Sequence, residues 1–331
     1  MKSLNYLITG GAGYVGCELS NFLLNNSHSV KIVDTFYFDT KFKKNKNLTL
    51  EKKDVRNLEV SDFKGIDIVI DLASISNDPS GELNPYLTYK INGESRGRTA
   101  SLAKIAGVKG YLLASSCSVY GFSKIIVSEE STTNPLTTYA YANLLAEKLV
   151  QNLSSKEFSV IVFRQATLFG TSQRMRTDLV VNGMTYSGMQ NGKIDILRNG
   201  NQKRPILSLN ELNNRFLSIN EKQFKKFNKE IFNIGNNKLN LDINSIYKIV
   251  NEALGGTLKK NWYGEPDYRS YEVNFDKAEK LLPKIEKTDI VNEVLNIKNR
   301  FEDKNFDYQK SNTLNWYKKL LSSNPEIFNI F

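Results

Sequence analysis

The sequence predicts an α/β protein with a doubly wound, mainly parallel sheet and a smaller α/β lobe interwoven with it. Two observations lead to this prediction. Short apolar runs alternate with longer helical patterns through the first half of the chain, and a glycine-rich turn joins the first apolar run to the first helical pattern. Strands that alternate with helices in this way imply right-handed βαβ crossovers, and such crossovers place the strands parallel in one sheet.

The apolar runs predict strands at residues 4–8, 30–33, 66–72, 110–114 and 158–163. Helical patterns follow at residues 15–25 and 86–106, and a further helix follows Tyr139. After about Gly170 the alternation breaks up, and no linker rich in proline, glycine or serine marks a boundary. We therefore expect residues 1–170, with about 205–236 returning to them, to form a first domain. Residues 171–204 and 237–331 are expected to form the second lobe.

Composition excludes several classes of protein. The 331 residues carry 45 Lys and Arg against 35 Asp and Glu, a formal net charge of +10 that favours anionic partners. Two cysteines and one histidine argue against a disulfide scaffold and a histidine-ligated metal site, so no metal is expected. The sequence has no dense basic stripe with interleaved aromatic residues, so no nucleic-acid partner is expected. The N-terminus lacks a signal-peptide core and no stretch is apolar enough for a membrane span, so the expected location is cytoplasmic. The amphipathic segment 314–321 is expected to dock on its own domain rather than on a membrane.

A glycine-rich loop predicts a dinucleotide site. Gly10, Gly13 and Gly16 follow the first strand, and Tyr14 and Val15 open the helix between them. This spacing permits a tight turn, a close approach of the backbone to a pyrophosphate, and close packing of the helix on the strand. The predicted ligand is NAD.

Carboxylates after the second strand refine the cofactor prediction. Asp34 ends that strand, 24 residues after Gly10. A carboxylate there accepts hydrogen bonds from the ribose hydroxyls and repels a 2′-phosphate, which favours NAD over NADP. Asp54 and Val55 are candidates to reach the adenine, although a surface turn is a competing interpretation for Asp54.

Several further segments carry a family resemblance. With the glycine loop, residues 71–74 (DLAS), 76–79 (SNDP), 115–121 (SSCSVYG), 174–182 (RMRTDLVVN) and 204–205 (RP) resemble the extended short-chain dehydrogenase/reductases. Within that family the chain resembles the NAD-dependent epimerases and dehydratases that act on nucleotide sugars. The resemblance implies a Rossmann domain and a homodimer formed through the helices near residues 86–106 and 139–153. It also implies that Leu72, Ala73, Ser74 and Asn92 line the cofactor site, while residues 167–170 pass the nicotinamide.

The resemblance also implies the catalytic residues. Ser116 corresponds to the Ser or Thr that hydrogen-bonds the reacting sugar oxygen, and Tyr139 to the tyrosine that acts as general base. The family places a lysine four residues after that tyrosine, where it lowers the pKa of the phenol and contacts the nicotinamide ribose. Here that position holds Asn143, which retains hydrogen-bonding capacity without a positive charge. A slower base, a different base and lost activity are the alternatives that follow.

The second lobe is expected to hold the nucleotide diphosphate, because arginine suits phosphate oxygens. The resemblance assigns this binding to Asn182, Arg204 and Arg269, and Arg174 and Arg176 are plausible additions on the loop after Gly170. Ser116, Cys117 and Ser118 are expected on the sugar side. Cys117 is interpreted as a packing residue rather than a nucleophile, since no histidine is available to activate it.

The sequence therefore predicts an NAD-dependent oxidoreductase acting on a nucleotide sugar at C4. A 4-epimerase and a 4-dehydrogenase that releases a keto-sugar both fit, and surface polysaccharide biosynthesis is the expected setting. The alternative from another class is a catalytically impaired NAD-binding homologue with a regulatory or scaffold role, which Asn143 supports. The presence of both Ser116 and Tyr139 argues against it.

Overall fold

The computed structural model describes residues 3–265, 270–304 and 306–323. A seven-stranded sheet in the order β11-β7-β5-β4-β1-β2-β3 forms its centre, and each neighbouring pair of strands is parallel. The order runs outward in both directions from β1, which confirms the predicted doubly wound sheet. The strands are β1 (Asn5–Thr9), β2 (Ser29–Asp34), β3 (Leu48–Lys52), β4 (Ile68–Asp71), β5 (Gly110–Ser116), β7 (Ser159–Gln165) and β11 (Glu230–Ile234).

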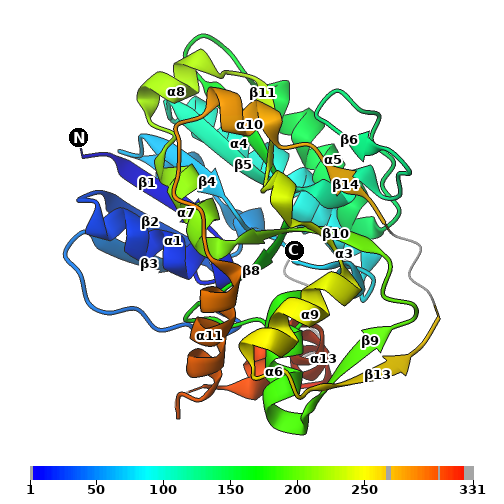
Figure 1. Cartoon of the computed structure of the whole chain (residues 1–331). Helices are drawn as coiled ribbons and strands as arrows, with labels where there is room; N and C mark the ends of the chain where they lie inside the picture. The colour runs from blue at the N-terminus through cyan, green and yellow to red at the C-terminus, as the bar shows by residue number, and fades with distance from the viewer. Residues whose placement is uncertain (1–2, 266–269, 305, 324–331) are drawn as a thin grey trace.

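Alternating side chains of this sheet enter two separate hydrophobic cores, because successive residues of a strand point to opposite faces. Helices α1 (Tyr14–Asn25) and α7 (Leu209–Leu217) cover one face, and α4 (Ser95–Ile105) and α5 (Thr138–Gln151) cover the other (Figure 1). In β1, for example, Tyr6 and Ile8 pack toward α1 while Leu7 packs toward α4 and α5. Both faces are therefore buried, as a parallel sheet requires.

Two strands of the central sheet, β3 and β11, were not predicted, and one predicted helix is divided. The strand β3 is an edge strand with largely exposed side chains, so it lacks the apolar run that indicates a buried strand. The helical stretch predicted at 86–106 consists of α3 (Pro85–Tyr89), a π-helical turn at Lys90–Glu94, and α4. Single π turns inside helices are frequent near functional sites.

The second lobe surrounds a core of its own. Helices α6 (Val180–Asn191), α9 (Ile243–Ala253) and α11 (Ile290–Phe301) pack together there, with β9 (Lys193–Leu197) and β13 (Lys259–Tyr263) paired at the side. Three short strands, β8 (Thr167–Phe169), β10 (Lys203–Ser208) and β12 (Asn240–Asp242), form a second sheet. The predicted domain boundaries stay a prediction. Side chains of residues 271–282, which were expected in the second lobe, pack in the core beneath α1 and α7. The remaining short elements are α2 (Asp78–Gly81), β6 (Ile126–Val127), α8 (Glu221–Lys226), β14 (Glu272–Val273), α10 (Asp276–Leu281) and α12 (Tyr308–Ser311).

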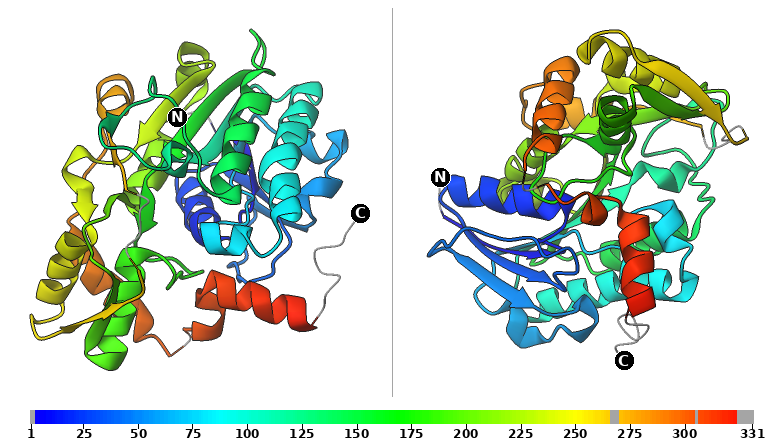
Figure 2. Two further views of the ribbon diagram at one scale, coloured as in Figure 1. Left: turned by 90° about the vertical axis from the view of Figure 1, so that its right-hand side faces the viewer. Right: turned by 90° about the horizontal axis from the view of Figure 1, so that it is seen from below.

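The C-terminal helix α13 (Thr313–Ser323) lies against the loop that follows β2, far from it in sequence (Figure 2). The indole nitrogen of Trp316 donates a hydrogen bond to the carbonyl oxygen of Tyr37 at 2.7 Å, and the rings of Tyr317 and Phe38 meet edge to face at 5.6 Å. The amphipathic segment thus docks on its own chain, as predicted. Within the described ranges no helix combines the length and apolar character needed to cross a membrane.

Candidate active site

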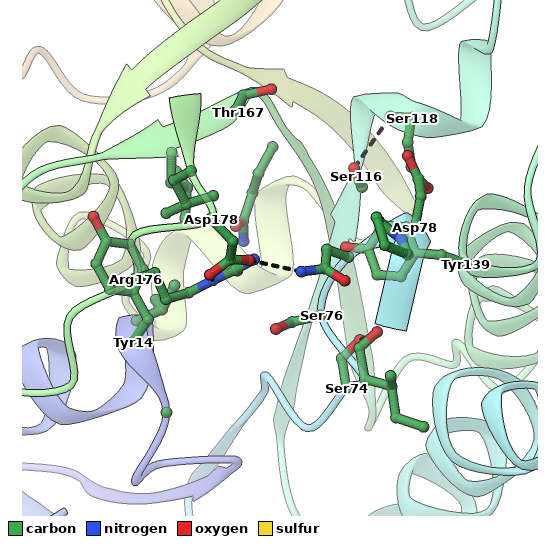
Figure 3. Close-up of a pocket in the computed structure, with 18 of the residues that line it drawn as sticks. Tyr14, Ser74, Ser76, Asp78, Ser116, Ser118, Tyr139, Thr167, Arg176 and Asp178 are labelled. Atoms are coloured by element: carbon green, nitrogen blue, oxygen red, sulfur yellow. Dashed lines mark hydrogen bonds and ion pairs between the residues drawn. The ribbon is translucent and has the colours of Figure 1, made fainter. Parts of the chain in front are cut away.

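A cavity of about 980 Å³ opens at the carboxyl ends of the central strands, between the sheet and the second lobe (Figure 3). In parallel α/β sheets ligands bind at this edge, where the strand order reverses. Residues from the glycine loop, from the ends of β2, β4 and β5, from α5 and from the second lobe line it. One end of the cavity is therefore suited to a dinucleotide, and the other faces the second lobe.

The glycine loop has no room for side chains. Gly10 has a left-handed φ of +67°, and a Cβ at this residue would lie 2.8 Å from the backbone of Ala73. A Cβ at Gly16 would lie 2.5 Å from the carbonyl oxygen of Gly10. The first turn of α1 carries no acidic residue and no side-chain cap, so its backbone N–H groups are available to an anion. The loop thus has the geometry that a pyrophosphate needs, and Leu72, Ala73 and Ser74 line the cavity beside it.

Asp34 lines the cavity next to this loop. Its carboxylate accepts hydrogen bonds from the backbone N–H of Ala12 at 2.9 Å and of Phe36 at 2.7 Å. Burial raises the pKa of this carboxyl, and these backbone donors oppose the rise. The side chain is therefore held in place at the position predicted for the ribose hydroxyls. Asp54 and Val55 also line the cavity, but the Asp54 carboxylate is already engaged by the Arg56 guanidinium at 2.9 and 3.0 Å.

Arg174 lies at the cofactor end rather than with the other arginines of the second lobe. Its guanidinium stacks on the Phe38 ring at 3.8 Å and donates to the Thr313 hydroxyl at 2.9 Å. The side chain is buried, and its Nε has no hydrogen-bond partner. Burial, with a smaller contribution from Arg176, lowers the pKa of the guanidinium to about 10, so it remains charged at neutral pH. A buried cation with an unused donor suits an anionic ligand. The predicted contact of Arg174 with the substrate diphosphate stays a prediction.

The fit to NAD follows from these features. The glycine cradle and the first turn of α1 would hold the pyrophosphate, Asp34 would accept the ribose hydroxyls, and Arg174 would pair with a phosphate oxygen. Asn312 and Tyr317 line the same cavity from the C-terminal segment. That segment therefore covers the cofactor end, which the sequence did not indicate.

Tyr139 and Ser116 line the other part of the cavity and lie on neighbouring elements (Figure 3). Tyr139 is the second residue of α5, whose first turn is capped by the Thr137 hydroxyl, and Ser116 ends β5. Burial raises the pKa of the Tyr139 phenol, and the carboxylate of Asp78 raises it further. Positive charge on Arg96 and Arg176 and a hydrogen bond with Ser116 act in the opposite direction. The phenol is thus placed beside a hydroxyl and between charges of both signs, as a tunable acid–base group requires.

Across the cavity from Tyr139 lies an ion pair within the loop after Gly170, and a hydrogen bond from Asn77 links it to the segment after β4. The Arg176 guanidinium meets the Asp178 carboxylate at 2.5 Å, and the Asn77 side-chain amide donates to the same carboxylate at 2.6 Å (Figure 3). Burial by itself would raise the pKa of Asp178, but the pairing with Arg176 outweighs it and holds the pKa well below the usual range. On the Tyr139 side, Asp78 accepts a hydrogen bond from the Thr137 hydroxyl at 2.7 Å.

Two other residues expected to bind substrate line the cavity, Arg204 and Ser118. The Arg204 guanidinium, on β10, lies 6.0 Å from the centre of the buried Tyr271 ring. Ser118 lies near Ser116, and its hydroxyl has no hydrogen-bond partner. Arg269 lies outside the described residues.

Four predicted site residues have buried side chains that the structure uses internally. Asn92 makes two hydrogen bonds to the backbone of Ile75, and the Cys117 thiol donates to the carbonyl oxygen of Arg164. Asn182 accepts from the backbone N–H of Gly170 at 3.1 Å and donates to the carbonyl oxygen of Arg176 at 3.0 Å. None of Asn92, Cys117, Asn143 and Asn182 is more than 1 % exposed. These four side chains are not among the residues that line the cavity, and their predicted contacts with cofactor or substrate stay predictions.

Sequence reasoning missed three participants in the site. Asp78 belongs to a segment that carried the resemblance, but the pattern gave no reason to expect it beside Tyr139. Arg96 lies in the helical stretch predicted at 86–106, which was expected to provide Asn92 and a dimer contact, while Arg96 itself was given no role. Tyr271 comes from the segment between β13 and β14, where regular patterns end, and no local signal could have placed it in the cavity.

Known proteins resemble this chain in sequence. A model described as the NAD dependent epimerase/dehydratase family matches residues 6–235. An uncharacterized UDP-glucose epimerase, YtcB, of Bacillus subtilis is 28 % identical over 63 % of this chain and 70 % of that protein. A UDP-glucuronate 4-epimerase of Thermodesulfobacterium geofontis is 26 % identical over 84 % of this chain and 90 % of its own length. A UDP-glucuronic acid decarboxylase of Danio rerio is 28 % identical over 64 % of this chain, and the match spans about half (53 %) of that protein.

Solved structures agree on the fold. The structure of MoeE5 in complex with UDP-glucuronic acid and NAD superposes with a TM-score of 0.80, at 22 % identity, over 90 % of this chain and 99 % of that one. The family match covers more than half of the chain, and it begins in the strand that leads to the glycine cradle and includes Ser116 and Tyr139. The chain belongs to the NAD-dependent epimerase/dehydratase family, and it is an enzyme whose cofactor is NAD.

Proposed function

We propose that the chain oxidises the C4 hydroxyl of a nucleotide-diphosphate sugar and restores it with inverted configuration, as a 4-epimerase. The single observation that carries this proposal is the sharing of one cavity by the glycine cradle and the Ser116–Tyr139 pair. A sugar that reaches this pair extends toward Arg204 and Tyr271 of the second lobe. The relatives named for UDP-glucose and UDP-glucuronate support a uridine diphosphate sugar as the first choice.

The protein's own groups divide the chemistry between them. Bound NAD supplies the acceptor that takes up the hydride and returns it. The phenolate of Tyr139 removes the proton of the sugar hydroxyl, and the Ser116 hydroxyl forms a hydrogen bond to the same oxygen. The proton stays on the Tyr139 oxygen until it returns to the inverted alcohol. Arg204 pairs with the diphosphate, which holds the nucleotide in place while the keto-sugar rotates.

The cover over the cofactor end favours epimerisation over release of a keto-sugar. An epimerase regenerates its own oxidised cofactor, whereas a dehydrogenase must exchange it after each turnover. Asn312 and Tyr317 line the cavity, and α13 is fixed by Trp316 to the loop after β2. Retained NAD is consistent with a closed redox cycle.

The assembly and setting are also proposals. Large apolar or aromatic side chains are exposed along α3, α4 and α5, namely Tyr86 and Ile105 (both 68 %), Tyr141 (50 %) and Leu149 (37 %). These helices lie side by side and would pair with a second copy to form a homodimer. Exposed apolar patches of this kind mark interaction surfaces. We place the enzyme in the cytoplasm, on a route that supplies sugars for surface polysaccharides.

The test is a panel of UDP-, GDP-, dTDP- and CDP-sugars incubated with the purified chain, while absorbance of reduced nicotinamide and product stereochemistry by NMR are recorded. Inversion at C4 without net accumulation of NADH is the expected result. Stoichiometric NADH would refute the epimerase and identify a dehydrogenase. Neither signal with any sugar would refute turnover and leave a binding protein. The Ser116→Ala and Tyr139→Phe variants are the controls.

A further inference from the structure

Arg96 is a fully buried arginine beneath the active site. It belongs to α4, its side chain is 1 % exposed, and its guanidinium reaches the carboxyl ends of β4 and β5. Nε donates to the Asp71 carboxylate at 3.1 Å, and Nη2 donates to the carbonyl oxygens of Asp71 at 2.6 Å and Ala114 at 2.7 Å. Nη1 donates to the side-chain oxygen of Asn143 at 3.1 Å. The arginine is therefore locked in one orientation.

Asn143 connects this arginine to the catalytic helix. Its side-chain oxygen accepts from Arg96, and its side-chain nitrogen donates to the backbone oxygen of Tyr139 at 2.9 Å. The residue is 1 % exposed, so these contacts occur away from water. Asn143 is the position where the family pattern places a lysine. A lysine ammonium there would face the guanidinium of Arg96 in a buried setting, where like charges strongly disfavour each other.

We propose that Arg96 replaces that lysine as the buried cation behind Tyr139. The neutral Asn143 lies between Arg96 and the backbone of Tyr139 and forms a hydrogen bond with each. Arg96 and Asn143 are then positioning residues, since neither is placed against the sugar. This inference rests on the proposed function, because Tyr139 must ionise only if it is the base.

The other charges around Tyr139 show why a second cation is useful. Asp78 faces it from α2 and disfavours its anion, and Tyr271 approaches from the second lobe. Arg176 favours the anion, but Arg176 is paired with Asp178 at 2.5 Å.

Arg96 is paired with Asp71, yet that carboxylate also accepts hydrogen bonds from the hydroxyls of Thr9 at 2.5 Å and Tyr111 at 2.6 Å. These hydroxyls stabilise the negative charge of Asp71, so the carboxylate does not depend on the guanidinium alone. The positive charge of Arg96 favours the phenolate of Tyr139, in the direction in which the arginine acts on its pKa.

A matched pair of variants tests the charge separately from the hydrogen bonds. Arg96→Lys and Arg96→Gln both lose the guanidinium fork, and they differ in charge. The pKa of Tyr139 is read in the purified full chain by near-ultraviolet titration of tyrosinate, with Tyr139→Phe in each background subtracted. We expect Arg96→Gln to raise the pKa of Tyr139 and to reduce epimerisation at neutral pH by about tenfold or more, with the loss recovered at higher pH. Arg96→Lys is expected to keep both close to the parent.

Introducing the family lysine provides a second, independent test. Asn143→Lys alone is expected to lower resistance to urea, because it adds a cation beside Arg96. The same substitution in the Arg96→Gln background is expected to bring the pKa of Tyr139 back down and to recover stability. Equal pKa values of Tyr139 in Arg96→Lys and Arg96→Gln would overturn the inference, as would additive effects in the Asn143→Lys combination.

The readouts separate this inference from the proposed function. If the parent chain turns over no nucleotide sugar, the proposed function fails, while the tyrosinate titration still reports whether the charge of Arg96 acts on Tyr139. If the parent epimerises a sugar and the titration is insensitive to that charge, only the role of Arg96 is refuted.

Discussion

Arg174 provides the sharpest test of where the cofactor lies. The structure buries its guanidinium with an unused Nε donor, stacked on Phe38 and hydrogen-bonded to Thr313. Arg174→Met retains much of the side-chain volume and removes the charge. Loss of one charge-assisted hydrogen bond to a phosphate, about 1.5–3 kcal/mol, predicts that NAD binds roughly 10- to 150-fold more weakly.

The same substitution should have little effect on the protein freed of dinucleotide. It gives up the bond to Thr313, worth about 1 kcal/mol, but it also removes the cost of burying a cation with an unsatisfied donor. The free energy of unfolding in urea is therefore expected to stay within about 1 kcal/mol of the parent or to rise. Calorimetric titration of NAD gives the affinity. Arg204→Met, at the substrate end, is the matched control and should leave NAD affinity unchanged. A large loss of stability with unchanged NAD affinity would show that Arg174 is only structural.

Four further substitutions test other parts of the site. Gly16→Ala should abolish NAD binding in the same titration, because its Cβ would lie 2.5 Å from the carbonyl oxygen of Gly10; retained affinity would contradict a rigid cradle. Tyr317→Ala should speed the release of bound NAD in a chase experiment by removing a side chain that lines the cavity from α13. Asp178→Asn breaks a buried ion pair and should lower the free energy of unfolding by about 3–5 kcal/mol at neutral pH. Because folding lowers the pKa of Asp178, this difference from the parent should shrink as the pH falls through that pKa. Urea unfolding at several pH values measures it. Tyr139→Phe should reduce the epimerisation rate by about 10²–10⁴-fold without changing NAD affinity, and a smaller loss would assign the base elsewhere.

Local patterns predicted the cofactor half well, because its determinants are contiguous. The glycine loop needs only a strand, a turn and a helix in succession, and Asp34 follows the next strand directly. Five of the seven strands of the central sheet were found from their apolar runs. β3 was missed because an edge strand with exposed side chains has no such run, and β11 at the other edge was also missed. The general base and Ser116 came from motifs that are likewise short.

The remainder of the site depends on contacts between distant segments. Arg96 meets Asp71 and Asn143 across 25 and 47 residues, and Arg174 meets Thr313 across 139. No periodicity in the sequence reports such pairs. From the motif alone, Asn143 was interpreted as a residue that lacks the charge of the family lysine, and it supported the catalytically impaired alternative. Its contacts instead make it one half of a buried pair, and the pair is intelligible only when both helices are placed on the sheet.

The proposed retention of the cofactor and the proposed role of the buried cation favour the same kind of chemistry. An epimerase must move a proton off and then back onto the same oxygen within one binding event, so the base must be comparably stable in both protonation states. Burial and the Asp78 carboxylate raise the pKa of Tyr139, and Arg96 opposes them, which limits the preference for the protonated phenol. Under the proposed function, the C-terminal segment that lines the cofactor end would oppose exchange of NAD between the two half-reactions. A dehydrogenase would gain from neither arrangement, because it needs the proton to leave and the reduced cofactor to depart.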